Sequence, residues 1–194
     1  MYLFGSVCMT LAFVSCVASL LCGVAALWVK PLGGRKGAVA RVAAWTALAN
    51  FALLTVCCLI LVVCFLIGDY SIYYVLEEHS NGTGLMGILY RVSGLWAGRA
   101  GSLLFWAWLI TLFNAFIARR VIRGCEDMDQ IALLVMNVVL LAFQGVLVFS
   151  SANAPFAPTP EHYLNADGTV ASLASSFGMN PLLEHWAQAI HPPT

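Results

Sequence analysis

Residues 1–29 read MYLFGSVCMTLAFVSCVASLLCGVAALWV and contain no Asp, Glu, Lys, Arg or His. At about 1.5 Å of rise per residue, a helix of this length exceeds the hydrocarbon thickness of a bilayer, which is about 30 Å. A cleavable signal peptide has its positive charges before a shorter apolar stretch, whereas here Lys30, Arg35 and Lys36 follow the stretch. The segment is therefore predicted to be a retained transmembrane helix.

The composition extends this prediction to the whole chain. Of the 194 residues, 61% are apolar and 9% are charged, whereas about 25% of the residues of a soluble domain are charged. Further apolar stretches lie at about residues 42–67, 102–118 and 131–150. We therefore predict an all-α polytopic integral membrane protein. Residues 1–150 would form four transmembrane helices, and residues 151–194 a tail with a short external helix near its end.

The charges between the spans predict the orientation. The loop from Lys30 to Arg41 has basic residues and no acidic residue, and the loop after the third span contains Arg119, Arg120 and Arg123. Basic loops face the cytoplasm. The tail after Ser150 has acidic residues but no Lys or Arg. Both termini are therefore predicted to lie on the extracytoplasmic side.

The segment of residues 84–101 mixes apolar residues with Arg91 and ends in a glycine-rich turn. Such a segment is expected to lie along the membrane surface. Trp28 and Trp108 lie near span ends and are expected in the aromatic belts of the bilayer interface.

The cysteines and histidines form no recognisable metal motif. Six of the seven cysteines lie in apolar stretches and none forms a CxxC pair, so they are predicted to be small packing residues. His79 and His162 stand beside acidic residues and are predicted to be solvated. His185 and His191 are not spaced to share a helix face, which disfavours a local metal pair. No catalytic residue is assigned, and the sequence has no motif of a self-contained hydrolase.

Two stretches resemble the CcmF/CcsA superfamily of membrane proteins that attach haem to apocytochrome c, and specifically the N-terminal portion of CcmF. The first is YRVSGLWAGRAGSLLFW at residues 90–106, which is similar to the tryptophan, glycine and Gly-Ser-Leu-Leu-x-Trp pattern of the family. The second is the tail, with NAPF at residues 153–156, GMNPLL at 178–183 and IHPP at 190–193.

The resemblance implies a cofactor and a site. It implies that His191 is an axial ligand of a b-type haem (haem b) in the membrane domain, and that this haem reduces a second, external haem. Reduced iron favours the thioether bonds that the second haem forms with apocytochrome c. Arg91 and Arg99 are candidate contacts of a haem propionate; binding of lipid phosphates is the alternative for both. The implied location is the bacterial cytoplasmic (inner) membrane.

The sequence also departs from the family pattern. Arg99-Ala100 stands where the family has a His-Glu pair, and the family's tryptophan-rich external segment and its second haem-ligating histidine are not in the sequence. We therefore expect either the N-terminal subunit of a split haem lyase or a fragment, inactive alone. The expected partners are a second CcmF-like subunit with the tryptophan-rich segment that shares the haem, a haem chaperone, apocytochrome c and the lipid bilayer, but no nucleic acid.

Two other functions remain open. The chain could be a cofactor-free membrane anchor or assembly subunit of a respiratory complex. A transporter module is less favoured, because transporters place ionisable residues at mid-membrane and the predicted spans have essentially none.

Overall fold

The computed structural model describes residues 1–28, 35–124, 126–165, 167 and 169–187. Four long helices dominate these residues: α1 (Tyr2–Trp28), α2 (Arg35–Ile67), α5 (Arg99–Arg123) and α6 (Asp127–Phe149). All four are long and apolar enough to cross a membrane. The prediction of an all-α polytopic membrane protein is confirmed.

The helices extend beyond the apolar stretches of the sequence. Helix α2 begins at Arg35 and α5 ends at Arg123, so both include charged residues at the end where α6 begins. Backbone hydrogen bonding does not require apolar side chains, and long basic side chains reach the interface from inside a span. Hydropathy therefore marks only the part of each helix that lies in hydrocarbon.

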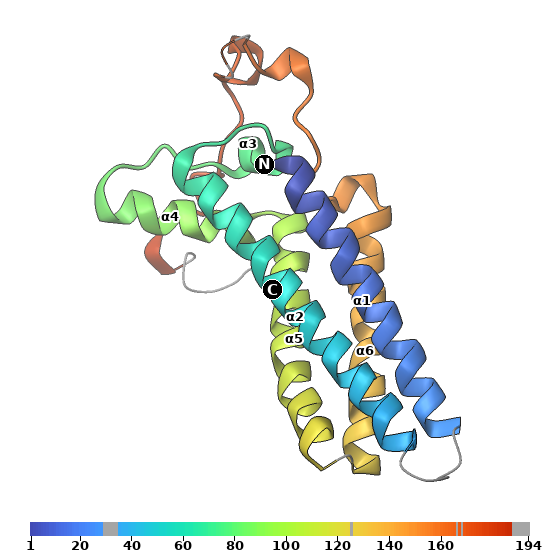
Figure 1. Ribbon diagram of the computed structural model, residues 1–194. Helices are drawn as coiled ribbons and strands as arrows, with labels where there is room; N and C mark the ends of the chain where they lie inside the picture. The colour runs from blue at the N-terminus through green and yellow to red at the C-terminus, as the bar shows by residue number, and fades with distance from the viewer. Residues whose placement is uncertain (29–34, 125, 166, 168, 188–194) are drawn as a thin grey trace.

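The four spans form a closed ring in which each helix packs against two neighbours, in the order α1, α2, α5, α6 (Figure 1). Alanines line the contacts at one end of the ring, where Ala43 and Ala47 of α2 are buried in one cluster with Ala26 of α1 and Ala118 of α5. In lipid there is little hydrophobic force between helices, so small residues stabilise the packing by letting the helices approach closely.

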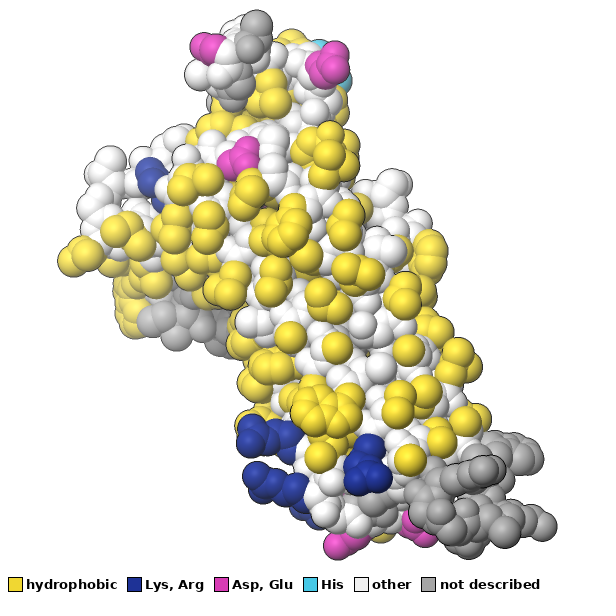
Figure 2. Space-filling view, in the orientation of Figure 1, with side chains coloured by type: hydrophobic (Ala, Val, Ile, Leu, Met, Phe, Trp, Pro, Cys, Tyr) yellow, Lys and Arg dark blue, Asp and Glu magenta, His cyan; other side chains and the backbone are white. Residues whose placement is uncertain are grey.

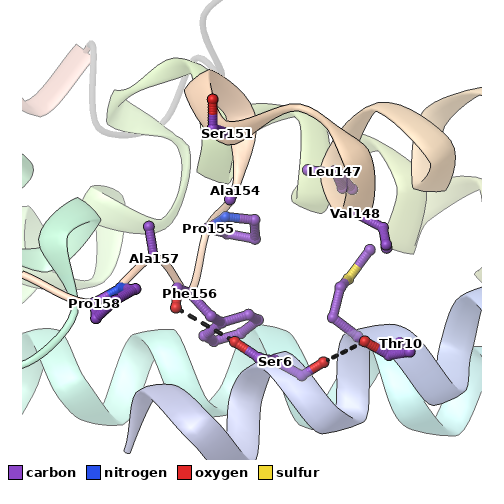
Figure 3. A pocket seen from close by; sticks show the side chains of 11 residues that line it. Ser6, Thr10, Leu147, Val148, Ser151, Ala154, Pro155, Phe156, Ala157 and Pro158 are labelled. Atoms are coloured by element: carbon purple, nitrogen blue, oxygen red, sulfur yellow. Dashed lines mark hydrogen bonds between the residues drawn. The ribbon is translucent and has the colours of Figure 1, made fainter.

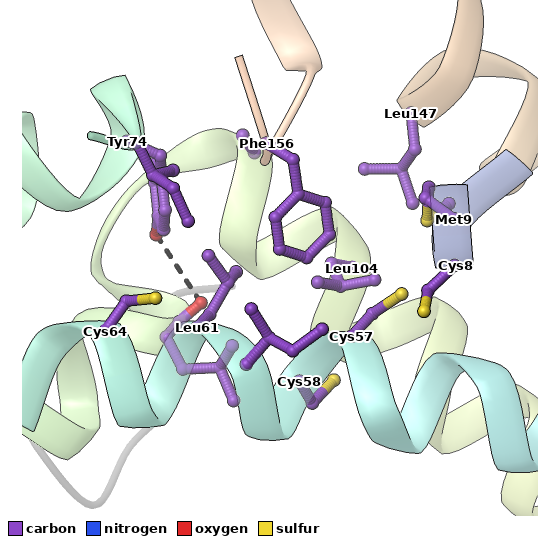
Figure 4. Packing of buried hydrophobic residues seen from close by; sticks show 14 of the residues in the cluster. Cys8, Met9, Cys57, Cys58, Leu61, Cys64, Tyr74, Leu104, Leu147 and Phe156 are labelled. Carbon is purple, nitrogen blue, oxygen red and sulfur yellow. Dashed lines mark hydrogen bonds between the residues drawn. The ribbon is translucent and has the colours of Figure 1, made fainter. Parts of the chain in front are cut away.

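Cysteines supply small side chains at the other end of the ring. Cys8 of α1 and Cys57 of α2 are buried among Leu61, Leu104 and Leu147 (Figure 4). The six cysteines that the structure describes are free thiols, and five of them are buried. Their surroundings agree with the prediction of packing residues; Cys125 lies outside the described residues.

Hydrogen bonds of side-chain amides connect the helices inside the bundle, a feature that was not predicted from the sequence. Asn114 of α5 donates from Nδ2 to Oδ1 of Asn137 on α6 at 3.0 Å. Asn137 donates to Ser19 Oγ of α1 at 2.8 Å, and Ser19 donates to the carbonyl of Ala43 on α2 at 2.7 Å. These three hydrogen bonds, which we call the amide network, join all four spans. Unsatisfied polar groups are costly in hydrocarbon, so the network favours this helix arrangement over others.

The short elements gather at one end of the bundle (Figure 1). They are α3 (Tyr73–Glu78), α4 (Gly84–Ala97) and the tail from residue 151, with the 3₁₀ turns η1 (Ser151–Asn153), η2 (Glu161–Tyr163) and η3 (Ser172–Ala174). We call this the tail end. Most Lys and Arg side chains visible in Figure 2 lie at the opposite end. Of the predicted external helix, residues 186–187 are helical, residues 181–185 form turns and a bend instead, and residues 188–194 lie outside the described residues.

Trp108 differs from the prediction of an interfacial residue. Its indole Nε1 donates to Thr55 Oγ1 of α2 at 2.9 Å, and its ring stacks on Phe105 with centroids 5.7 Å apart. Trp108 therefore joins α5 to α2 inside the bundle. The side chain of Trp28 lies outside the described part of the chain.

Candidate functional site

Of the stretches that resemble the CcmF pattern, residues 153–156, residues 178–183 and the first part of residues 90–106 lie at the tail end, whereas residues 190–193 lie outside the described residues. Helix α4, which contains the first half of residues 90–106, runs across the direction of the spans (Figure 1). It buries Gly87, Ser93, Gly94 and Leu95 and leaves Leu85 86% exposed. An exposed apolar side chain on a helix perpendicular to the spans is typical of a segment that lies in the membrane surface.

Tyr74 of α3 holds the junction between α4 and α5. Its hydroxyl donates to the carbonyl of Gly94 at 2.8 Å and accepts from the backbone N–H of Gly98 at 3.0 Å. The side chain is buried, and this burial raises the pKa of Tyr74 well above its usual value. The phenol therefore stays protonated and keeps its hydrogen bond to α4.

The glycines of the junction leave room for this contact. A Cβ atom added to Gly101 would collide with the carbonyl of Leu95 and the hydroxyl of Tyr74, and one added to Gly98 would collide with the Glu78 carboxylate. A Cβ on Gly94 would lie 2.8 Å from the ring of Phe65. The glycine pattern that resembles the family is thus required by close packing at the tail end.

Replacing Gly101 with alanine is expected to destabilise the fold by roughly 1–3 kcal/mol, because the added methyl group meets backbone rather than a movable side chain. The measurement is detergent-induced unfolding followed by circular dichroism. Gly145→Ala is the matched control, since a Cβ there meets open space and alanine favours a helix. Equal stability of the two variants would contradict the packing argument.

The NAPF stretch fixes the tail to the first span (Figure 3). Phe156 is buried, and its ring lies directly on Gly5 of α1, where a Cβ would collide with it. Ser6 Oγ donates to the carbonyl of Phe156 at 3.4 Å. Beside these contacts, α1, α6 and the tail enclose an apolar cavity of about 290 Å³. Residues 153–156 therefore act as a structural attachment of the tail.

The GMNPLL stretch attaches the tail to the end of α3. The N–H groups of Gly178 and Met179 donate to the carbonyls of Glu77 and His79 at 3.1 and 2.8 Å. Gly178 has φ +142°, a conformation that favours glycine. His79, which was predicted to be solvated, is half-buried, and its Nδ1 lies 2.8 Å from the carbonyl of Leu76.

A polar cavity of about 430 Å³ lies between these attachments. Arg99, Glu77 and Glu78 line it, with Phe177 and Gly178 of the tail. Burial, and then the charge of Glu77, raise the pKa of Glu78. A carboxylate with a raised pKa is poorly solvated when ionised.

The raised pKa of Glu78 predicts a pH dependence of stability. A group whose pKa is higher in the folded state favours folding below its unfolded-state pKa, and this contribution is lost as pH rises through the folded-state value. In lipid-free detergent, stability is therefore expected to fall as pH rises from 4.5, the ordinary value of Glu78, toward neutrality. Glu78→Gln should weaken this fall and raise stability at neutral pH, whereas Glu161→Gln, at an exposed position, should not. Identical pH profiles of Glu78→Gln and the unmodified chain would contradict the assignment.

The predicted site residues do not share one pocket. Arg91 donates from Nη1 to the carbonyl of Leu66 at 3.5 Å, at the C-terminal end of α2, where carbonyls lack helical partners. Arg99 instead lines the polar cavity. His191, the predicted haem ligand, lies outside the described residues.

The histidines that the structure does describe do not fit a buried haem. His162 and His185 are exposed, and His79 lines a second polar cavity together with Glu78 and Glu184. No group of three metal-ligating side chains occurs among the described residues. The fit of a haem to this chain therefore depends on His191.

The fold and the tail end together define a class: an all-α membrane protein of four spans, with a surface helix and an attached tail at one end. The chain is 30% identical over 160 residues to the probable cytochrome c-type biogenesis protein NrfE of Escherichia coli (strain K12), covering 82% of this chain and 26% of NrfE. It is 27% identical over 181 residues to the cytochrome c-type biogenesis protein CcmF of Haemophilus influenzae, covering 92% of this chain and 25% of that protein.

A solved structure has a similar fold. Cytochrome c Heme Lyase CcmF matches 84% of this chain and 26% of its own chain, with a TM-score of 0.65 and 24% identity. No protein-family model matches the chain. The resemblance to CcmF-type cytochrome c biogenesis proteins, predicted from residues 90–106 and the tail, is confirmed. The chain spans about a quarter of the length of these relatives.

Proposed function

We propose that this chain takes part in cytochrome c maturation as the N-terminal part of a CcmF-type haem lyase assembly. The similarity to cytochrome c biogenesis proteins along 82% of the chain is the observation on which this proposal rests. The chain spans about a quarter of the length of those relatives, and we propose that it acts together with a partner. We place it in the bacterial cytoplasmic membrane, with the tail end on the extracytoplasmic side.

The proposed partner is a second CcmF-like membrane subunit with the tryptophan-rich haem-handling segment. A haem chaperone would deliver the haem, and apocytochrome c would receive it. In this assembly the chain supplies a rigid outer surface, because Tyr74 fixes the α4–α5 junction and Phe156 fixes the tail to α1.

We also propose that His191 provides one axial ligand of a haem b shared with the partner. A neutral imidazole binds haem iron when its other nitrogen has a hydrogen-bond partner. Such a haem would supply an electron for the external haem. The propionate contacts of Arg91 and Arg99 remain predictions, and their separate surroundings do not favour a joint contact with one propionate.

Deleting the gene for this chain tests the proposed function. Covalently bound haem in c-type cytochromes, detected by haem staining of denaturing gels, is expected to disappear and to return on complementation. A cofactor-free anchor of a respiratory complex would instead leave haem staining unchanged and lower one oxidoreductase activity. That result would contradict the proposal.

A further inference from the structure

The polar cavity at the tail end contains both signs of charge. The guanidinium of Arg99 and the carboxylates of Glu77 and Glu78 line the same space of about 430 Å³. Among the residues that the structure describes, Arg99 forms no ion pair with either carboxylate. The cavity therefore presents a cation and two anions that do not neutralise one another by direct contact.

The cavity lies at the depth of lipid headgroups. Arg99 and Ala100 begin the α5 span, and Ala152, which also lines the cavity, lies just beyond the end of α6. Headgroups occupy this boundary between the hydrocarbon and water. Phe177 and Gly178 of the tail also line the cavity. The molecules most available to such a site are the phospholipids of the surrounding membrane.

The charges specify which headgroup fits. Arginine binds phosphate through paired hydrogen bonds, and a primary ammonium donates up to three hydrogen bonds to carboxylates. Ligand pockets of about 300–1,000 Å³ are typical of small molecules. We propose that this cavity binds the headgroup of phosphatidylethanolamine, with the phosphate at Arg99 and the ammonium at Glu77 and Glu78.

Other ligands of similar chemistry fit less well. A haem propionate or the headgroup of phosphatidylglycerol would meet Arg99 but leave both carboxylates without a cation. Phosphatidylcholine has a positive charge, but its quaternary nitrogen has no hydrogen to donate. A half-buried carboxylate such as Glu78 gains most from a cation that can also donate hydrogen bonds.

Native mass spectrometry of the delipidated full chain tests the proposal. The chain is offered equimolar phosphatidylethanolamine, phosphatidylcholine and phosphatidylglycerol with identical acyl chains. Phosphatidylethanolamine is expected to bind about tenfold more than either competitor, since charge-assisted hydrogen bonds form at both ends of its headgroup. Arg99→Gln should reduce its binding by a similar factor. Glu78→Gln should remove its advantage over phosphatidylcholine.

Arg123→Gln is the matched control, because Arg123 is an exposed arginine in the last turn of the same helix, at the opposite end of the bundle; it should leave the preference for phosphatidylethanolamine unchanged. A circular dichroism melt checks that each variant is folded, and Arg99→Lys replaces Arg99→Gln if the latter is not. Equal binding of the three lipids would overturn the proposal. Strongest binding of phosphatidylglycerol, or no effect of Glu78→Gln, would also overturn it.

Discussion

Replacing Asn137 with leucine is expected to destabilise the bundle by roughly 2–4 kcal/mol, because it leaves one buried donor without an acceptor, at about 1–3 kcal/mol, and removes a second hydrogen bond, at about 0.5–1.5 kcal/mol. The partners of Asn137 are Asn114 Nδ2 and Ser19 Oγ, both on other helices and both buried. Interhelical hydrogen bonds in membranes average about 0.6 kcal/mol, so the unpaired Nδ2 of Asn114 accounts for the larger part of the loss, whereas Ser19 keeps its hydrogen bond to the carbonyl of Ala43. Unfolding in sodium dodecyl sulfate, followed by circular dichroism, measures the loss.

Two comparisons separate the network from general packing. Val138→Leu changes the neighbouring residue, which is 54% exposed, and should alter stability by less than about 0.5 kcal/mol. The double variant of Asn114 and Asn137, both to leucine, should lose less than the sum of the single losses, because the two side chains share one bond. Additive losses would show that the network does not act as a unit.

Replacing His191 with alanine is expected to lower covalent haem in c-type cytochromes about tenfold or more, since an axial ligand fixes the position and potential of a haem iron. The measurement is haem staining in the deletion strain complemented with the variant. The chain should remain in the membrane at its normal amount, because residues 153–156 and 178–179 attach the tail before His191 is reached.

His185→Ala is the control for this variant. His185 lies in the same exposed part of the tail, and its Nδ1 only accepts from the N–H of Ala187 at 3.3 Å. Cytochrome maturation should be unaffected by this change. Equal losses in the two variants would indicate a general disturbance of the tail rather than a ligand at His191.

The four membrane spans were predictable because the thickness of the bilayer's hydrocarbon core sets a minimum length for an apolar helix that crosses it. A segment such as residues 1–29 has no charged side chain over the thickness of a bilayer, so its helix follows from the sequence alone. The ends of α2 and α5 were not predictable in this way, since Arg35 and Arg123 belong to helices but not to apolar stretches.

The buried amides of α6 could have been predicted from the spacing of polar residues in the sequence. Asn137 and Gln144 lie seven residues apart on the buried stripe of α6, a spacing that returns to the same helix face. Gln144 donates to Asn50 of α2 at 3.1 Å, so both amides point into the bundle. Polar residues in periodic positions of a span indicate a buried face. The residues to which these amides bond could not be predicted, because the spacing of polar residues along one helix does not show which other helices pack against it.

The tail end could be predicted only in outline. The glycine pattern at residues 94–101 indicated a tight turn, but nothing in the sequence connected it with Tyr74, which lies on a separate helix. Arg99 and Glu78 line the same cavity only because α3, α5 and the tail converge. Contacts between distant segments depend on tertiary packing, which neither periodicity nor composition contains.

The spectrum of the purified assembly tests the central claim most directly. The tagged chain is isolated from membranes with its bound partners, and a reduced-minus-oxidised absorption spectrum is recorded for the unmodified chain and for His191→Ala. The account predicts a b-type haem band with the unmodified chain and its loss with His191→Ala, while the polytopic partner still copurifies. A b-type band of equal size in both preparations, or no haem in either, would contradict it.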